Sequence, residues 1–169
     1  MKINNLNFTN SLFKFKVSDE IKSKLNHEDY IVLTEIGLPT KILSNSFIYN
    51  EQVFEDNYGS IILGFNTHVV EWKLKIKMND SSIFYSGKGN LTNEIYAFYN
   101  SSISNLLLSL LSYDFFIRKL IVSKSLGEYH TNHEKYADLL FELIADIDKV
   151  AIENGVWQSL IDEMRLGVI

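Results

Sequence analysis

The sequence predicts an α+β protein with a single domain, residues 1–169, in which an antiparallel β-sheet meander is flanked by N-terminal and C-terminal helices. Three observations support this fold class. The length, with 46% hydrophobic and 22% charged residues, is typical of one globular domain. Residues 70–78 alternate apolar and charged side chains, which is the period of a half-buried strand. In the second half of the chain, apolar residues recur at helical spacing instead.

The N-terminal part is expected to contain one short helix. Residues 19–25 form it, with Ser18 as the candidate N-cap, and residues 27–36 follow as an extended segment. Residues 37–39 are expected to form a loop, because Pro39 lacks an amide hydrogen and a glycine precedes it by two positions. The apolar run 60–65 predicts a strand buried on both faces.

Residues 70–78 are the clearest strand of the meander. Alternation predicts that one set of side chains faces the core and the other faces water. The core set includes Val70, Trp72, Leu74 and Ile76, and the exposed set is Lys73, Lys75 and Lys77. A turn at 79–82 leads into a second strand from residue 83, a loop follows at 87–90, and residues 94–99 form a third strand.

The second half of the chain is expected to be helical. Asn100, Ser101 and Ser102 are predicted to cap a long apolar helix that lies against the sheet. A second helix is expected over 132–153, ended by Gly155, and a last helix over 157–166. The expected apolar stripe of the helix over 132–153 is Tyr136, Leu139, Leu140, Leu143, Ile144, Ile147 and Val150.

The acidic charge is concentrated in the last quarter of the chain. The net charge is −5, and residues 128–169 hold nine acidic and three basic residues. This composition argues against nucleic acid as the partner, because phosphate contacts need clustered lysine and arginine. It is compatible with a basic protein partner.

Four carboxylates four residues apart form the candidate partner-binding site. They are Glu134, Asp138, Glu142 and Asp146 on the second long helix. Like charges at this spacing repel each other, so the helix bears a small cost that a cationic partner would remove. The alternative is that they form a solvated face that keeps the protein soluble.

The sequence contains no pattern that indicates an enzyme, so we expect none and assign no catalytic residue, cofactor or metal. Cysteine is absent, and His130 and His133 lack further ligands at a metal-binding spacing. Residues 87–89 lack the remainder of a phosphate-binding loop. No secretory signal and no apolar stretch of about 20 residues is present, so a cytoplasmic protein without membrane contact is expected.

Four segments, in their order and spacing, resemble the SUKH superfamily, in particular its fourth group of bacterial immunity proteins. They are Ile36-Gly37-Leu38-Pro39, Ile61-Ile62-Leu63-Gly64, residues 96–107 with their Asn-Ser-Ser motif, and residues 157–163 with their leading Trp157, followed by Gly167. Residues 66–77 depart from the family pattern by their additional lysines.

The resemblance implies a SUKH-like α+β fold and a function in toxin neutralisation. Such a protein binds a cognate secreted toxin domain, often a nuclease or a nucleic-acid deaminase, and inhibits it stoichiometrically, without turnover or cofactor. The alternative is an intracellular interaction or regulatory scaffold of the same fold that has no toxin partner.

Overall fold

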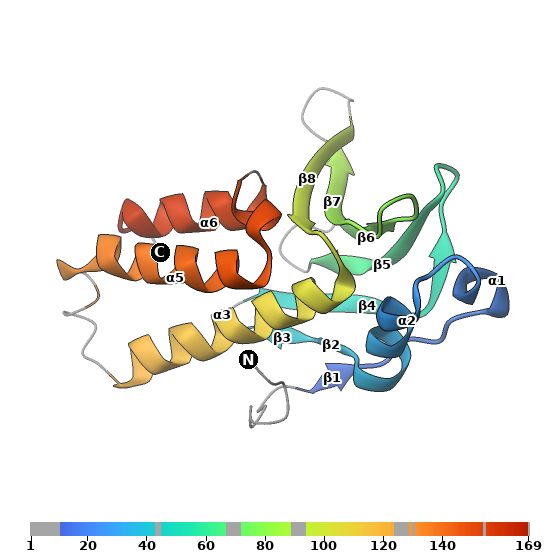
Figure 1. Ribbon diagram of the computed structural model, residues 1–169, viewed down its shortest axis with the longest axis horizontal. Coiled ribbons are helices and arrows are strands. Elements are labelled where there is room, and N and C mark those ends of the chain that lie inside the picture. The colour runs from blue at the N-terminus through green and yellow to red at the C-terminus, as the bar shows by residue number, and fades with distance from the viewer. Residues whose placement is uncertain are drawn as a thin grey trace.

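The computed structural model describes residues 11–42, 45–66, 72–88, 94–123, 129, 131–153 and 155–168. It confirms the α+β class with an antiparallel meander (Figure 1). Among the described residues the main sheet has six strands: β3 (Lys41–Ile42), β4 (Asn45–Glu55), β5 (Ser60–Asn66), β6 (Lys73–Lys77), β7 (Ile83–Lys88) and β8 (Glu94–Asn100). Each strand pairs with its neighbour in the sequence. A small second sheet pairs β1 (Leu12–Phe13) with β2 (Leu38–Pro39).

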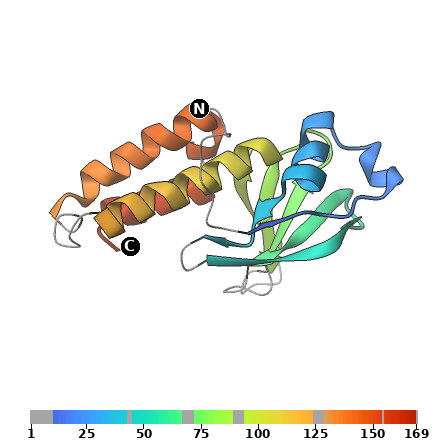
Figure 2. The same ribbon diagram turned by 90° about the horizontal axis from the view of Figure 1, so that it is seen from below.

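Helices precede and follow the sheet. They are α1 (Asp19–Lys22), α2 (His27–Ile31), the π-helix η2 (Val32–Ile36), α3 (Ile103–Ser123), α5 (His133–Ile147), the 3₁₀-helix η3 (Lys149–Ile152) and α6 (Val156–Arg165). The beginning of α3 lies against the sheet, whereas α5 and α6 extend with the remainder of α3 beyond the sheet (Figure 2). Buried apolar side chains of the sheet and of these helices belong to one hydrophobic cluster.

The prediction that residues 27–36 are extended is wrong, because the segment is helical throughout. The Asn26 side chain accepts a hydrogen bond from the amide of Asp29 at 2.7 Å and so caps α2. The amide of Gly37 donates to the Val32 carbonyl at 2.6 Å and closes the π-helix. Gly37 has a φ of 96°, and a Cβ there would lie 2.6 Å from the Phe13 carbonyl oxygen, so this stop requires glycine.

The predicted alternation in β6 is confirmed at four positions. Leu74 and Ile76 are fully buried on the helix-covered face, and Lys73 and Lys77 are exposed on the other face. Trp72 is half-buried and packs against Gly87, and Val70 lies outside the described residues.

The expectation that Lys75 is exposed is wrong. Its side chain points to the outer face as predicted, but only 4% of the residue is exposed. The register places Lys75 between Ile62 and Phe84 on the neighbouring strands, and both of these side chains are buried. Its Nζ lies 2.9 Å from Oδ2 of Asp56, which supplies the opposite charge that a buried lysine needs.

The single helix expected over 132–153 is broken at Asp148. This residue has φ −150° and ψ 90°, so α5 ends at Ile147 and the 3₁₀-helix η3 follows. The break lets the Asp148 carboxylate turn inward, where Oδ2 accepts hydrogen bonds from the Ser101 amide at 2.7 Å and from Nδ2 of Asn100 at 3.1 Å. Two tertiary hydrogen bonds therefore outweigh the local helical preference.

Candidate functional site

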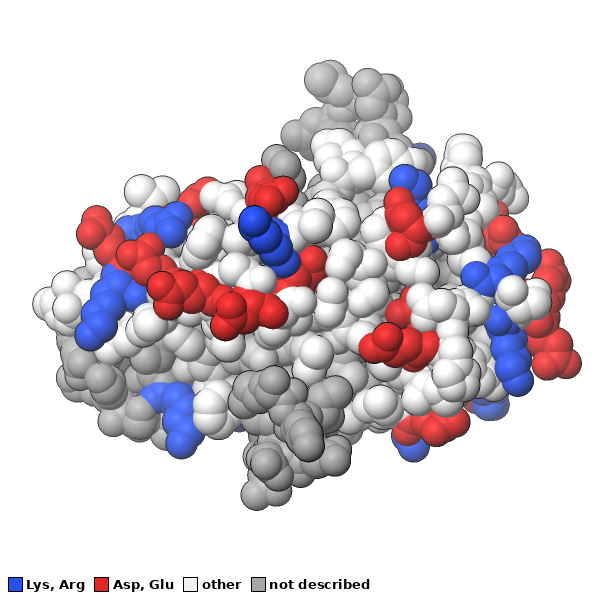
Figure 3. All heavy atoms as spheres, in the orientation of Figure 1, with Lys and Arg blue, Asp and Glu red and all other residues white. Residues whose placement is uncertain are grey.

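The four carboxylates predicted as a partner-binding site lie on one solvent-exposed face of α5. Glu134, Asp138, Glu142 and Asp146 are all exposed, and we call them the acidic row. Figure 3 shows acidic side chains in a nearly continuous band across the helices at the left of the view. The structure thus brings all four predicted residues together on one rigid element.

Arg165 of α6 partly neutralises the acidic row. Its Nη2 lies 2.9 Å from Oδ1 of Asp138, and its Nη1 lies 3.4 Å from Oδ1 of Asp162. Within the described part of the chain, Glu134, Glu142 and Asp146 form no ion pair. Three carboxylates of the row therefore present their charge to solvent.

An exposed leucine lies within the acidic row. Leu139 was expected in the apolar stripe of the helix, but 43% of it is exposed, so this assignment is wrong. Its position, three residues before Glu142, places both side chains on the same face of α5. Singly exposed apolar residues are common on protein surfaces, so Leu139 adds apolar area to the row but does not by itself mark a binding site.

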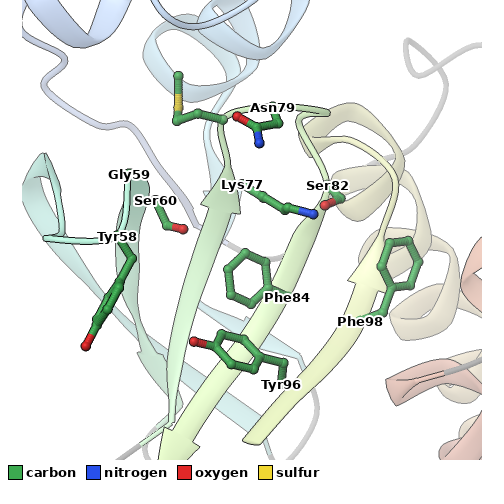
Figure 4. Close-up of a pocket in the computed structure, with 10 residues that line it drawn as sticks. Tyr58, Gly59, Ser60, Lys77, Asn79, Ser82, Phe84, Tyr96 and Phe98 are labelled. Atoms are coloured by element: carbon green, nitrogen blue, oxygen red, sulfur yellow. The ribbon is translucent and has the colours of Figure 1, made fainter. Parts of the chain in front are cut away.

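A second surface, which the sequence analysis did not predict, is a groove on the outer face of the sheet. It encloses about 490 Å³. Figure 4 shows the rings of Phe84 and Tyr96 side by side, with Lys77 and Ser82 at one end and Tyr58 across the sheet. Phe98 completes the lining on β8. We call this surface the aromatic groove.

The aromatic groove combines ring faces with polar groups at its rim. The ring centroids of Phe84 and Tyr96 are 5.6 Å apart, and Tyr96 is 57% exposed. At the rim, Nζ of Lys77 lies 3.4 Å from Oδ2 of Asp80. Hydrogen bonds from Ser82 hold the pKa of Asp80 below its ordinary value against the opposing effect of burial, and the Lys77 ammonium adds to them. Asp80 is therefore ionised at neutral pH.

The Asn-Ser-Ser motif and Trp157 form a buried polar network rather than a binding site. Nε1 of Trp157 donates to Oδ1 of Asn100 at 3.0 Å, and Nδ2 of Asn100 donates to Ser109 and to Asp148, both at 3.1 Å. Asn100 and Ser109 are fully buried, and Trp157 is 2% exposed. These hydrogen bonds connect β8 with α3, η3 and α6.

Ser102 performs the predicted capping function. Its Oγ accepts a hydrogen bond from the Asn105 amide at 3.1 Å. Asp29 of α2 provides a second acceptor, because its Oδ1 lies 3.2 Å from the amide nitrogen of Ile103. Burial raises the pKa of Asp29 above its ordinary value, and its hydrogen bonds with Asn26, the Ile103 amide and Ser81 oppose the increase.

The structure also locates one of the two histidines weighed as metal ligands. His133 is half-buried at the start of α5, and His130 lies outside the described residues. No three histidine, aspartate or glutamate side chains gather to form a metal site within the described part of the chain. In the same part, no helix is long and apolar enough to span a membrane.

Comparison with protein-family models, with curated proteins and with solved structures gave no match.

Proposed function

We propose that this protein is an immunity protein that binds a cognate secreted toxin domain, a nuclease or a nucleic-acid deaminase, and neutralises it by stoichiometric inhibition. The acidic row of α5 is the observation that carries the proposal. The resemblance of the sequence to SUKH immunity proteins supports the same function.

The geometry of the acidic row suits the capture of a basic protein surface. Toxins that act on nucleic acid need a cationic surface to bind phosphates. Carboxylates held along one helix attract such a surface over a distance and accelerate the encounter. Leu139 provides an apolar contact within the row once the surfaces meet.

The test is inhibition of the toxin domain encoded beside this gene, with binding measured on the same samples. The informative variant is Glu142→Lys with Asp146→Lys, because neither residue forms an ion pair in the described structure and neither begins the helix. We expect slower association with the toxin and a weaker dependence of the association rate on salt.

The control is Glu35→Lys with Glu51→Lys, which changes the net charge equally at exposed positions of the N-terminal half. It breaks the ion pair of Glu51 with Lys16, which is exposed on both sides and therefore contributes little. It should bind at nearly the wild-type rate. Equal rates for both double variants would show that the acidic row is only a solvated face. A wild-type protein that neither binds nor inhibits the toxin would contradict the immunity function and favour a scaffold of the same fold.

A further inference from the structure

The aromatic groove is built mainly on neighbouring strands of the sheet, and Tyr58 and Tyr96 at its border are exposed. Phe84 pairs with Phe98, and Ser86 pairs with Tyr96, in the β7–β8 ladder. This register projects Phe84, Tyr96 and Phe98 to the same face of two neighbouring strands. Rings held on strands lose little further conformational freedom when they bind a partner.

The exposure of the rings points to a binding surface. Tyr96 is 57% exposed and Tyr58 is 80% exposed, although both border the groove. Aromatic side chains in a pocket are the residues that most often dominate the free energy of protein-protein binding. The buried Phe84 provides the floor of the groove, and the exposed rings provide its sides.

The charges of the groove select among possible occupants. Lys77 lies in the groove, where Asp80 offsets its charge, and Lys73 lies on the same face of β6, so the groove offers no net attraction to a cationic side chain. The carboxylate of Asp56 does not offset them, because it is paired with the buried Lys75. The ion pair of Lys77 with Asp80 is exposed on both sides and is therefore weak enough to exchange for another carboxylate.

The polar groups at the rim of the groove further restrict which side chain can occupy it. Ser82 already donates to Asp80, but the exposed side chain of Asn79 can hydrogen-bond to a group that enters between it and the rings. An aliphatic side chain offers no hydrogen bond to Asn79, whereas tyrosine or tryptophan presents a ring with a polar end. The face of such a ring also attracts an ammonium group such as that of Lys77.

We propose that the aromatic groove receives a tyrosine or tryptophan side chain from a loop of the toxin domain, and that a carboxylate of the same loop meets Lys77. This inference rests on the proposed function, because it names the part of the toxin that the sheet binds. The acidic row then governs the encounter, and the groove governs the lifetime of the complex.

The experiment compares kinetics of binding to the toxin domain for Tyr96→Ala, Lys77→Glu and Tyr96→Phe. Tyr96→Ala should weaken binding at least about tenfold, mainly through faster dissociation and with an unchanged salt dependence of association. Lys77→Glu should also weaken binding about tenfold, because it repels the carboxylate. Tyr96→Phe keeps the ring and should bind within about threefold of wild type.

The matched control is Phe115→Ala, which removes an aromatic ring of similar exposure from α3. It should bind as wild type does. If the toxin binds wild type and both groove variants with the same dissociation rate, or if Phe115→Ala is equally damaging, the groove assignment is wrong and the immunity function stands. If the wild-type protein does not bind the toxin, both the immunity function and the groove assignment are wrong.

Discussion

Asp56 and Lys75 form a buried ion pair at the outer face of the sheet. Oδ1 of Asp56 accepts hydrogen bonds from the amides of Tyr58 and Ser60 at 2.9 and 3.0 Å, and Oδ2 faces Lys75. Burial raises the pKa of Asp56, but the hydrogen bond from Ser60 and those from Lys75 and Tyr58 outweigh it, so the pKa lies below its ordinary value. Two charged residues are thus accommodated among apolar neighbours.

The lowered pKa of Asp56 determines how the stability of the protein depends on pH. A carboxyl group whose pKa is lower in the folded state stabilises the protein above its ordinary pKa of about 4, and this stabilisation is lost as the pH falls through the folded value. Asp56→Asn should therefore lower the free energy of unfolding at pH 7 by about 2 kcal/mol, because the buried Lys75 loses its charged hydrogen bond to this carboxylate. It should also flatten the loss of stability between about pH 5 and pH 3.

Urea unfolding of wild type and variant from pH 7 to pH 3 measures both effects. The control is Glu51→Gln, whose ion pair with Lys16 is exposed, and which should leave the stability at pH 7 nearly unchanged. An Asp56→Asn variant as stable as the control would show that the pair contributes nothing.

At the scale of elements, the end of α5 places an exposed aspartate and a buried aspartate within three residues of each other. Asp146 is exposed, whereas Asp148 is 4% exposed and accepts the hydrogen bonds of Ser101 and Asn100. Both are aspartates of one helical pattern in the sequence. The residues around each aspartate therefore determine whether its carboxylate faces solvent or accepts buried hydrogen bonds.

Substitutions at these two positions should affect stability very differently. Glu142→Lys with Asp146→Lys relieves like-charge repulsion and places lysine near the helix C-terminus, so the thermal midpoint should stay within about 2 °C of wild type. Asp148→Ala leaves buried donors unpaired and should lower the unfolding free energy by about 2 kcal/mol or more. Calorimetry and urea unfolding measure both. A much lower thermal midpoint of the double variant would show that Glu142 and Asp146 stabilise the fold, in contradiction to their exposure to solvent.

At the scale of the whole molecule, the polar network around Asn100 ties the sheet to the C-terminal helices. Gly155 reinforces this junction, because its φ is 120° and a Cβ there would collide with the Phe98 carbonyl oxygen of β8. The apolar cluster is also continuous between the sheet and the helices. The two halves should therefore not unfold independently.

We expect a single cooperative unfolding transition, and the two tryptophans test it. Trp72 reports on the sheet and Trp157 on the junction with α6, so Trp72→Phe and Trp157→Phe each leave one fluorophore. In each variant the fluorescence midpoint should coincide with the midpoint of far-UV circular dichroism. Trp157→Phe should be the less stable variant, because Asn100 loses a hydrogen bond in a buried site. Separate midpoints within one variant would show that the halves unfold in steps.

The sequence by itself determined the class of the fold and the position of the acidic row. Alternation in residues 73–77 predicted the face of each side chain, and spacing by four predicted the row on α5, because both depend on local backbone geometry. The strand β4, at residues 45–55, was not predicted.

The tertiary structure alone decided three features. Lys75 is buried because Asp56, Ile62 and Phe84 reach it from elsewhere in the chain, and α5 ends early because Asp148 binds residues of β8 and its loop. The aromatic groove arises because the β7–β8 register aligns the rings of Phe84, Tyr96 and Phe98. Aromatic residues occupy both faces of β8, at Tyr96 and Tyr99 for example. No local pattern could therefore show which of these rings is exposed. Local spacing determines where a side chain points, but distant residues determine what it meets.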